Sequence, residues 1–331
     1  MLVAGCCFRD EEMRRSVKMN SDYRGTCEAS GCEEEVIDLA FFYDFFDEAL
    51  GLFSPAPGGR PLVRIIQDDW ALFASDAIGE SILNQVCRDL DIPFNATSTV
   101  DYTNDVKRKV STWDNLKLSV LKEKRFFSDH NDLDSFDFLI PEATLYKNTK
   151  LYRARILPKG KTRLRCSEMG CPPRELATAG RANPPGISYL YLCGNEETTY
   201  YEVRAVQLDK LSIGCFKVQK DLAIVDFNTE ISLYLAFDGG SDLSDIVASK
   251  KIISAIREDM SRPMRRYDSE LEYIPTQMIC EYCKMQGAAG ISFDSTMHKG
   301  GKNYVLFDSA SAKCTKVFCR EVTDIEISVT Y

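Results

Sequence analysis

Our expectation for the fold rests on one stretch of sequence, Gly180-Arg-Ala-Asn-Pro-Pro-Gly-Ile-Ser-Tyr-Leu-Tyr-Leu-Cys193. Its beginning is rich in glycine and proline, which predicts a turn-rich loop that carries Arg181. Residues 188–193 predict a short strand with Tyr189 and Tyr191 on one face, because side chains alternate along a strand.

A helix is expected to follow this strand. Asn195 is typical of a helix N-cap, and Glu196 and Glu197 then lie in the first turn, where carboxylates suit the helix dipole. Glu202 falls about two turns into the helix. Loop, strand and helix therefore bring an arginine, a tyrosine and a glutamate within a short distance of one another.

A second strand is expected at residues 151–156, where Arg153 and Arg155 share one face and apolar side chains take the other. Two arginines side by side on a strand can bind a diphosphate in a bidentate manner, which lysines do less well. A solvated strand face paired with surface carboxylates explains the same residues. The residue types alone leave both interpretations open.

These motifs resemble those of the RES domain family, which is named for its arginine, glutamate and serine. The resemblance extends from Leu151 to Asp308 and keeps the order of the family's motifs. Besides the Gly-Arg-x-Asn loop, the aromatic strand and the helix, the matching segments are Leu151-Tyr-Arg-Ala-Arg155, Tyr273-Ile-Pro-Thr-Gln277, Gly290-Ile-Ser-Phe-Asp-Ser295 and Gly300-Gly-Lys-Asn-Tyr-Val-Leu-Phe307. Each segment alone is a weak signal, but all of them in order form a strong one.

Known members of this family are bacterial toxins that destroy NAD, with a fold similar to that of the ADP-ribosyltransferase toxins. The resemblance implies a toxin that cleaves the nicotinamide–ribose bond of NAD, by water (a glycohydrolase) or by phosphate (a phosphorylase). NAD is then the substrate, no cofactor is expected, and inorganic phosphate is the possible co-substrate. The resemblance also implies a helix-turn-helix, Xre-like antitoxin as a partner.

The resemblance assigns roles to particular side chains. It implies catalytic roles for Arg153, Glu202 and Ser295, and substrate-binding roles for Arg155, Arg181 and Tyr191. One departure concerns the Gly-Arg-x-Asn loop, where many relatives carry tryptophan and this chain has Ala182. The aromatic wall that the tryptophan would supply then has to come from elsewhere.

These residue types suit the breakage of the nicotinamide–ribose bond. The leaving group is a cationic pyridinium that departs neutral, and the transition state is oxocarbenium-like, as in glycoside hydrolysis. The protein must hold the diphosphate and place negative charge near the developing cation. The arginines would bind phosphate oxygens and Tyr191 would stack on the nicotinamide or ribose. Glu202 would stabilise the cation, and Ser295 would bind the substrate or position the acceptor.

Plainer explanations of the same residues stay open from the sequence alone. Glu202 could be a helix-surface carboxylate paired with Arg181. Tyr191 could belong to the core, and Ser295 could be an ordinary turn residue. His298 lies close to Ser295 in the sequence, but no third residue is evident that would orient a Ser–His pair.

Other functions have to be weighed beside NAD cleavage. The glycines do not supply the Gly-x-Gly-x-x-Gly fingerprint of dinucleotide cofactor binding, which argues against hydride transfer. An ADP-ribosyltransferase that modifies a macromolecule would use the same pocket, and so would a non-catalytic module that binds NAD or a partner. A free acceptor leaves no motif, so the sequence does not choose between water and phosphate.

The composition is that of an ordinary globular protein, with 331 residues and a net charge of −9. This charge argues mildly against nucleic-acid or anionic-membrane binding by the protein as a whole. No apolar run is long enough to span a membrane, and the first residues turn charged too early for a signal peptide. We therefore expect a cytoplasmic protein, and a homo-oligomer stays open.

The chain has 13 cysteines, an odd number scattered over a long sequence, which favours reduced thiols over a disulfide framework. Two pairs have suggestive spacing, Cys27 with Cys32 and Cys280 with Cys283. A structural zinc site usually needs four ligands, and the chain has only two histidines. We therefore expect no metal and interpret the paired cysteines as small buried hydrophobic residues.

Three segments are expected along the chain. Residues 1–25 lack a periodic pattern and predict a disordered arm. Residues 26–140 predict a mostly helical domain, because apolar residues recur at helical spacing at 36–53, 62–74, 76–90 and 113–127. Residues 148–331 predict an α+β catalytic domain with an ADP-ribosyltransferase-like mixed β core, a flap at 157–179 and a closing strand at 317–331.

Overall fold

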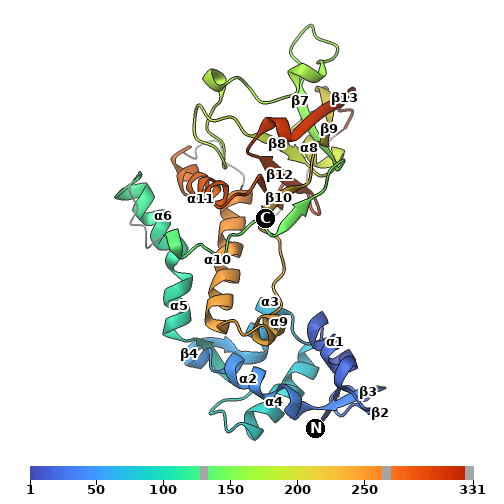
Figure 1. Ribbon diagram of the computed structural model, residues 1–331, viewed down its shortest axis with the longest axis vertical. Coiled ribbons are helices and arrows are strands. Elements are labelled where there is room, and N and C mark those ends of the chain that lie inside the picture. The colour runs from blue at the N-terminus through green and yellow to red at the C-terminus, as the bar shows by residue number, and fades with distance from the viewer. Residues whose placement is uncertain (127–132, 263–269, 325–331) are drawn as a thin grey trace. The chain divides into compact units, whose positions relative to one another are not determined.

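The structure is a computed structural model of the chain. It describes residues 1–126, 133–262 and 270–324 (Figure 1). Across these ranges, no helix combines the length and the apolar character that crossing a membrane requires.

The chain divides into two compact units, and each is described by itself. The first unit comprises Met1–Ser111 and Glu230–Lys251, and the second comprises Thr112–Thr229 and Ile252–Tyr331. This division differs from the expected one at two places. Residues 112–140 belong with the second unit, and a segment from the expected catalytic domain returns to the first.

Most of the first unit is helical. Its helices are α1 (Glu11–Asn20), α2 (Tyr43–Leu50), α3 (Leu62–Trp70), α4 (Asp76–Asp89), α5 (Asn104–Val110), α9 (Leu233–Asp238) and the beginning of α10 (Leu243–Ser261). Two small antiparallel sheets join them, one with the order β1 (Leu2–Ala4), β3 (Glu33–Asp38), β2 (Tyr23–Thr26), and one of β4 (Phe53–Pro61) with β5 (Thr99–Tyr102). The core of this unit includes the buried aromatic residues Phe8, Phe42, Phe45, Phe46 and Phe73.

Residues 1–25 are folded, where a disordered arm was expected. Helix α1 is capped by Asp10, whose side chain accepts hydrogen bonds from the backbone N–H groups of Glu12 and Met13. Met13 and Val17 lie one turn apart and are buried. Two apolar residues are enough to dock so short a helix, and a pattern that short gives no clear period in the sequence.

The segment 36–53 does not form the single helix expected from its apolar residues. Strand β3 ends at Asp38, whose side chain accepts a hydrogen bond from the backbone N–H of Ala40. A 3-10 turn, Leu39–Phe42, then leads into α2. The residues before Asp38 pair with β1, so pairing with another strand overrides the helical pattern there.

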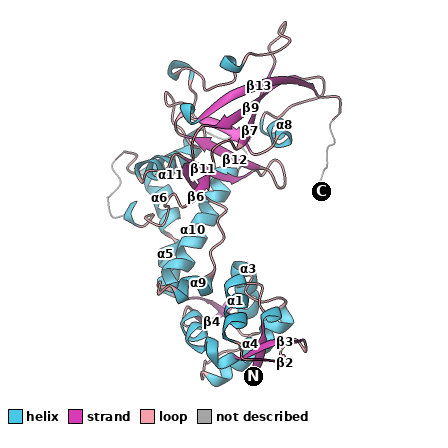
Figure 2. Cartoon of the chain, turned by 45° about the vertical axis from the view of Figure 1, so that its right-hand side comes forward, coloured by secondary structure: helices cyan, strands magenta, loops and turns pink. Residues whose placement is uncertain are grey.

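A mixed sheet dominates the second unit (Figure 2). Its strands lie in the order β13 (Ala312–Glu321), β9 (Lys210–Val218), β7 (Lys150–Ile156), β8 (Leu190–Cys193), β12 (Lys302–Leu306), β11 (Gly290–Asp294), β10 (Leu222–Asp226) and β6 (Ala143–Leu145). The helices of this unit include α6 (Thr112–Lys122), α8 (Glu196–Glu202), the end of α10 and α11 (Ile274–Met285). Among the described strands, β10 and β11 pair in parallel and the other neighbours are antiparallel. The expectation of α+β structure with a mixed sheet is confirmed.

Apolar residues cover both faces of this sheet. Val305 of β12 belongs to a cluster that contains Trp113 of α6. Leu306, its neighbour on the strand, belongs to a different cluster, which contains the fully buried Met169. The segment 157–179, expected to be a flap, is therefore anchored to the sheet through Met169.

Strands β7 and β8 are neighbours that separate. β7 pairs with β9 along its whole length, but it pairs with β8 at a single position, Tyr152 opposite Cys193. Beyond this pair the two strands no longer share hydrogen bonds. Residues of both strands line the cavity described below.

The closing strand is observed in part. Strand β13 ends at Glu321, where a strand to Tyr331 was expected, and residues 325–331 lie outside the described ranges. The helix expected at 113–127 corresponds to α6, which ends at Lys122. Residue 127 also lies outside the described ranges.

Candidate active site

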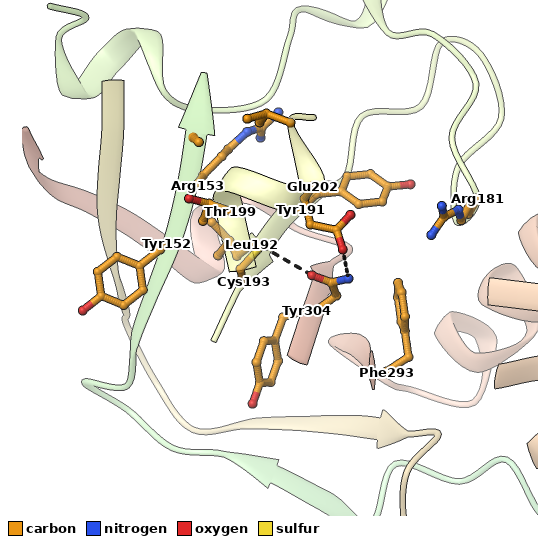
Figure 3. Close-up of a pocket in the computed structure, with 13 residues that line it drawn as sticks. Tyr152, Arg153, Arg181, Tyr191, Leu192, Cys193, Thr199, Glu202, Phe293 and Tyr304 are labelled. Carbon is orange, nitrogen blue, oxygen red and sulfur yellow. Dashed lines mark hydrogen bonds between the residues drawn. The ribbon is translucent and has the colours of Figure 1, made fainter. Parts of the chain in front are cut away.

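A cavity of ≈ 270 Å³ lies in the second unit, beside the point where β7 and β8 separate (Figure 3). Its lining comes from β7, β8, β11, β12, α8 and the loop before β8. The lining residues are Tyr152, Arg153, Ala154, Arg181, Tyr191, Leu192, Cys193, Thr199, Glu202, Val203, Phe293, Asn303 and Tyr304. Four of the six side chains singled out from the sequence are among them, although they come from separate elements.

Glu202 is the last residue of α8, and its carboxylate lies at the cavity. The helix begins after Asn195, whose side chain accepts a hydrogen bond from the backbone N–H of Thr198 at 2.8 Å, as expected. Oε1 of Glu202 accepts hydrogen bonds from Oγ of Ser295 at 2.6 Å and from Nδ2 of Asn303 at 2.8 Å. None of the described residues hydrogen-bonds Oε2, so one oxygen holds the carboxylate in place and the other is available to a ligand.

Ser295 lies in the turn after β11 and is almost fully buried. Its hydroxyl donates to Glu202 and accepts hydrogen bonds from the backbone N–H groups of Met297 and His298, both at 3.2 Å. Ser295 is not among the residues that line the cavity. Its contacts are those of a residue that positions Glu202.

Arg153 lies on β7 with a largely buried guanidinium, and its Nη1 has no hydrogen-bond partner among the described residues. Burial lowers the pKa of this guanidinium, and the charge of Arg155 lowers it further. A buried donor without a partner costs about 1–3 kcal/mol, and more where the group is charged. A ligand with an anionic oxygen at this place would remove the cost.

Arg155 extends from the same face of β7, but it does not line the cavity. Its Nη2 donates to the carbonyl oxygen of Gly170 at 2.6 Å, which ties the segment 157–179 to the sheet. The position of Arg155 therefore differs from the substrate-binding role that the resemblance implies. The flap expected at 157–179 differs as well, since no residue of that segment lines the cavity.

Arg181 and Tyr191 line the cavity from the loop and strand of the opening motif. Nη1 of Arg181 donates to the carbonyl oxygen of Met260 at 3.0 Å. The hydroxyl of Tyr191 donates to Oδ1 of Asn183 at 2.7 Å and accepts from the backbone N–H of Ala182 at 3.1 Å. Burial raises the pKa of this hydroxyl well above its usual range. Because the hydroxyl is bound within the loop, Tyr191 offers its ring to a ligand.

The Gly-Arg-x-Asn loop is fixed by helix α11. Nε2 of Gln277 donates to the carbonyl oxygens of Gly180 at 2.8 Å and of Asn183 at 3.0 Å. Gly180 has no room for a side chain, because a Cβ there would lie 2.6 Å from the hydroxyl oxygen of Tyr191. Ala182, at the position where the resemblance leads us to expect a tryptophan, is fully buried. The motif is therefore needed for packing as well as for its arginine.

Several lining residues were not expected from the sequence. Asn303 on β12 donates to Glu202, and it accepts a hydrogen bond from the thiol of Cys193 at 3.4 Å. An asparagine directly before the apolar run Tyr304-Val305-Leu306 was a signal that could have pointed to it. Phe293 and Tyr304 supply aromatic surface to a cavity whose loop lacks the tryptophan.

His298 does not form a catalytic pair with Ser295. Its Nδ1 lies 2.9 Å from Oγ1 of Thr198, and its ring stacks on that of Tyr201 with the centroids 4.8 Å apart. Only the backbone N–H of His298 contacts the hydroxyl of Ser295. The imidazole is thus occupied by α8, in agreement with the sequence argument.

The cavity combines two guanidinium groups, one carboxylate and several aromatic rings. Such a set can bind an anionic group and stabilise a positive charge that develops next to it. Across the described ranges, the group of cysteine, histidine or acidic ligands close enough to hold a metal lies elsewhere, in the first unit. The chemistry that the cavity itself offers is that of charge and hydrogen bonding.

A family model described as the RES domain matches residues 150–329, which is more than half of the chain. The chain belongs to the RES domain family. All the strands and loops that line the cavity fall inside this RES match, whereas α6 and the larger part of the first unit precede it.

Among solved structures, the chain is similar to one from the M. tuberculosis MbcT–MbcA toxin–antitoxin complex, with a TM-score of 0.32 and 13% sequence identity. The alignment covers 66% of this RES chain and 93% of that chain. No curated protein matches the sequence significantly.

Proposed function

We propose that this RES-domain chain is a toxin that consumes NAD by cleaving its nicotinamide–ribose bond. The observation that carries the proposal is the carboxylate of Glu202, fixed through Oε1, in the same cavity as the guanidinium of Arg153, whose Nη1 has no hydrogen-bond partner among the described residues. The guanidinium suits the diphosphate of NAD, and the carboxylate suits the cation that develops on the ribose. Membership of the RES family supports the same proposal. The similarity of fold to the ADP-ribosyltransferase toxins, which the resemblance implies, supports it as well.

Binding comes first in the proposed mechanism. Nη1 of Arg153 donates to a phosphate oxygen of NAD, and this removes the cost of leaving that donor buried without a partner. Arg181 adds a second positive charge at the cavity. The ring of Tyr191 packs against the nicotinamide or its ribose. These contacts hold the reacting bond beside Glu202, which lowers the entropic part of the barrier.

The bond then breaks with its electron pair moving to the pyridinium nitrogen, so that nicotinamide leaves neutral. The ribose becomes oxocarbenium-like, and Oε2 of Glu202 stabilises this cation. Ser295 and Asn303 hold Oε1 throughout, so the carboxylate need not reorganise as the charge develops. An oxygen of water or phosphate then forms the new bond to the ribose carbon. Water releases a proton to the solvent and gives ADP-ribose, whereas phosphate gives the phosphate ester of ADP-ribose.

Incubation of the purified chain with NAD, with and without inorganic phosphate, tests the proposal. Free ADP-ribose identifies a glycohydrolase, and a phosphate ester that forms only with phosphate identifies a phosphorylase. Transfer of label from NAD to a macromolecule would instead support an ADP-ribosyltransferase. If NAD is bound but not consumed, the chain is a binding module and the proposal is wrong.

We also propose a helix-turn-helix, Xre-like antitoxin as the partner of this chain. The support is the RES family, in which such antitoxins commonly restrain the toxin. Expression of the chain alone should stop bacterial growth and deplete NAD, and co-expression of its antitoxin should restore both. Loss of growth without loss of NAD would contradict the toxic activity proposed above.

A further inference from the structure

Four cysteines gather in the first unit. Cys6 and Cys7 end the 3-10 turn that follows β1, Cys27 follows β2, and Cys32 precedes β3. The sulfur atoms of Cys6 and Cys32 lie 2.6 Å apart, and those of Cys7 and Cys27 lie 3.2 Å apart. The hydroxyl of Ser30 lies 3.2 Å from the sulfurs of both Cys6 and Cys32. Cys6 and Cys7 are adjacent in the chain, and the backbone N–H of Cys27 donates to the carbonyl oxygen of Cys32 at 2.8 Å, so the two pairs lie side by side.

A carboxylate lies close to two of these sulfurs. A carboxylate oxygen of Glu34 and the sulfurs of Cys6 and Cys32 all lie within 4.8 Å of one another. The groove beside Cys6 is lined by three basic residues as well as two acidic ones, namely Arg14, Lys18, Arg24, Glu34 and Glu35. A carboxylate is a further candidate metal ligand beside the two sulfurs.

The sheet that these cysteines join belongs to the core cluster of the first unit, through Val3 and Ala4 of β1 and Val36 of β3. No residue of β2 is buried, and Val36 is the buried residue of β3. Cys7 and Cys27 are fully buried at the place where further core residues would be expected. Because Cys7 and Cys27 belong to this cluster and Cys27 follows the edge strand β2, a metal held by them would tie that edge to the core.

We propose that Cys6, Cys7, Cys27 and Cys32 form a structural zinc site that closes the N-terminal sheet. Four cysteines are a common ligand set for structural zinc, and Zn–S bonds of about 2.3 Å place tetrahedral sulfurs about 3.8 Å apart. Within each pair the sulfurs lie closer together than this. The ion therefore has to spread each pair slightly and draw the two pairs around itself. The sequence argument against a metal counted ligands near Cys27 and Cys32 and missed Cys6 and Cys7, which β1 brings beside them.

The test measures metal in the full-length chain, purified in the presence of a reductant and without added zinc. We expect one zinc ion per chain by elemental analysis and by native mass spectrometry. A chelator should remove the ion and lower the melting temperature, and added zinc should restore it. Cobalt should replace the zinc with the absorption of a tetrahedral thiolate complex. Because these readouts do not involve NAD, their failure is separate from failure of the proposed function.

Variants locate the site. Cys7→Ser and Cys27→Ser should lose the stoichiometric metal, whereas Cys87→Ser should keep it, since Cys87 is a buried cysteine on α4 of the same unit. Should the first two fail to fold, the chelator experiment on the natural chain still decides. A metal-free chain that takes up neither zinc nor cobalt would overturn the proposal. So would a mass deficit of four hydrogens in that chain, which shows two disulfides.

Discussion

The two oxygens of Glu202 have different surroundings, and this difference decides what a substitution should do. Oε1 accepts from Ser295 and Asn303, so the orientation of the side chain is already fixed before a ligand binds. Glu202→Gln keeps the size of the side chain but removes its charge. We expect turnover of NAD to fall about a hundred- to a thousand-fold with little change in NAD affinity, because the lost interaction forms mainly in the transition state.

Single-turnover kinetics and a separate binding assay check this expectation. The matched control is Glu197→Gln, which removes an exposed carboxylate from the first turn of the same helix. It should leave both quantities unchanged. If Glu202→Gln and the natural chain consume NAD at equal rates, Glu202 has no catalytic role.

Asn303 is a positioning residue in this scheme, because it acts through Glu202. Asn303→Ala removes one hydrogen bond to a charged group, which is worth about 1.5–3 kcal/mol, so turnover should fall by roughly tenfold or more. The Michaelis constant for NAD should stay nearly constant, since the ground-state contacts of the arginines remain. A rise in that constant at unchanged turnover would show that Asn303 binds the substrate directly.

We expect Arg153 to lower the stability of the unliganded protein and to raise its affinity for NAD. Its buried Nη1, which no residue in the described ranges hydrogen-bonds, costs free energy in the unliganded protein. Arg153→Met fills the same space without a charge, so the free energy of unfolding should rise by about 1 kcal/mol or stay the same. NAD affinity should fall sharply. Thermal melts with and without NAD test both parts, and a less stable variant would show that the guanidinium is satisfied in the free protein.

At the scale of elements, helix α8 and the turn 295–301 pack closely against each other at Gly301. A Cβ on Gly301 would lie 2.5 Å from Oγ1 of Thr198 and 3.0 Å from Nδ1 of His298. Gly301→Ala should therefore push the turn away from α8 and destabilise the protein by about 1–3 kcal/mol. It should also lower turnover, because Ser295 and Glu202 meet across this contact.

Denaturant unfolding and NAD turnover measure the two effects of Gly301→Ala. Gly58→Ala is the control, since a Cβ on Gly58 would meet nothing within 4 Å. If both variants behave alike, the turn tolerates displacement and the contact with α8 does not hold the carboxylate.

The elements also show what the sequence could and could not predict. The helix that delivers Glu202 was predictable because its signals are local, from the cap at Asn195 to the acidic first turn. The segment 36–53 was not, because its apolar residues fit a helix and only pairing with β1 makes part of it a strand. In the site, motif residues such as Arg153 were predictable, whereas the tie from Arg155 to Gly170 depends on where a long irregular segment packs.

At the scale of the whole molecule, the second unit begins before the family match. Helix α6 precedes residue 150, yet its Trp113 is buried in the cluster that contains Ile291 and Val305 of the mixed sheet. The indole N–H of Trp113 also donates to Oδ2 of Asp259 at 2.8 Å. The segment expected to end a separate helical domain is therefore part of the core that covers one face of the mixed sheet.

This placement leads to the last prediction. Trp113→Ala removes a large buried side chain and should destabilise the second unit by about 3–5 kcal/mol. Leu118→Ala on the same helix should cost little, because Leu118 is exposed. Thermal unfolding of the two variants, followed together with loss of NAD turnover, distinguishes them. Equal stability of the two would mean that α6 does not share the core of the sheet, and a shortened chain that starts at the family match should then fold as well as the full one.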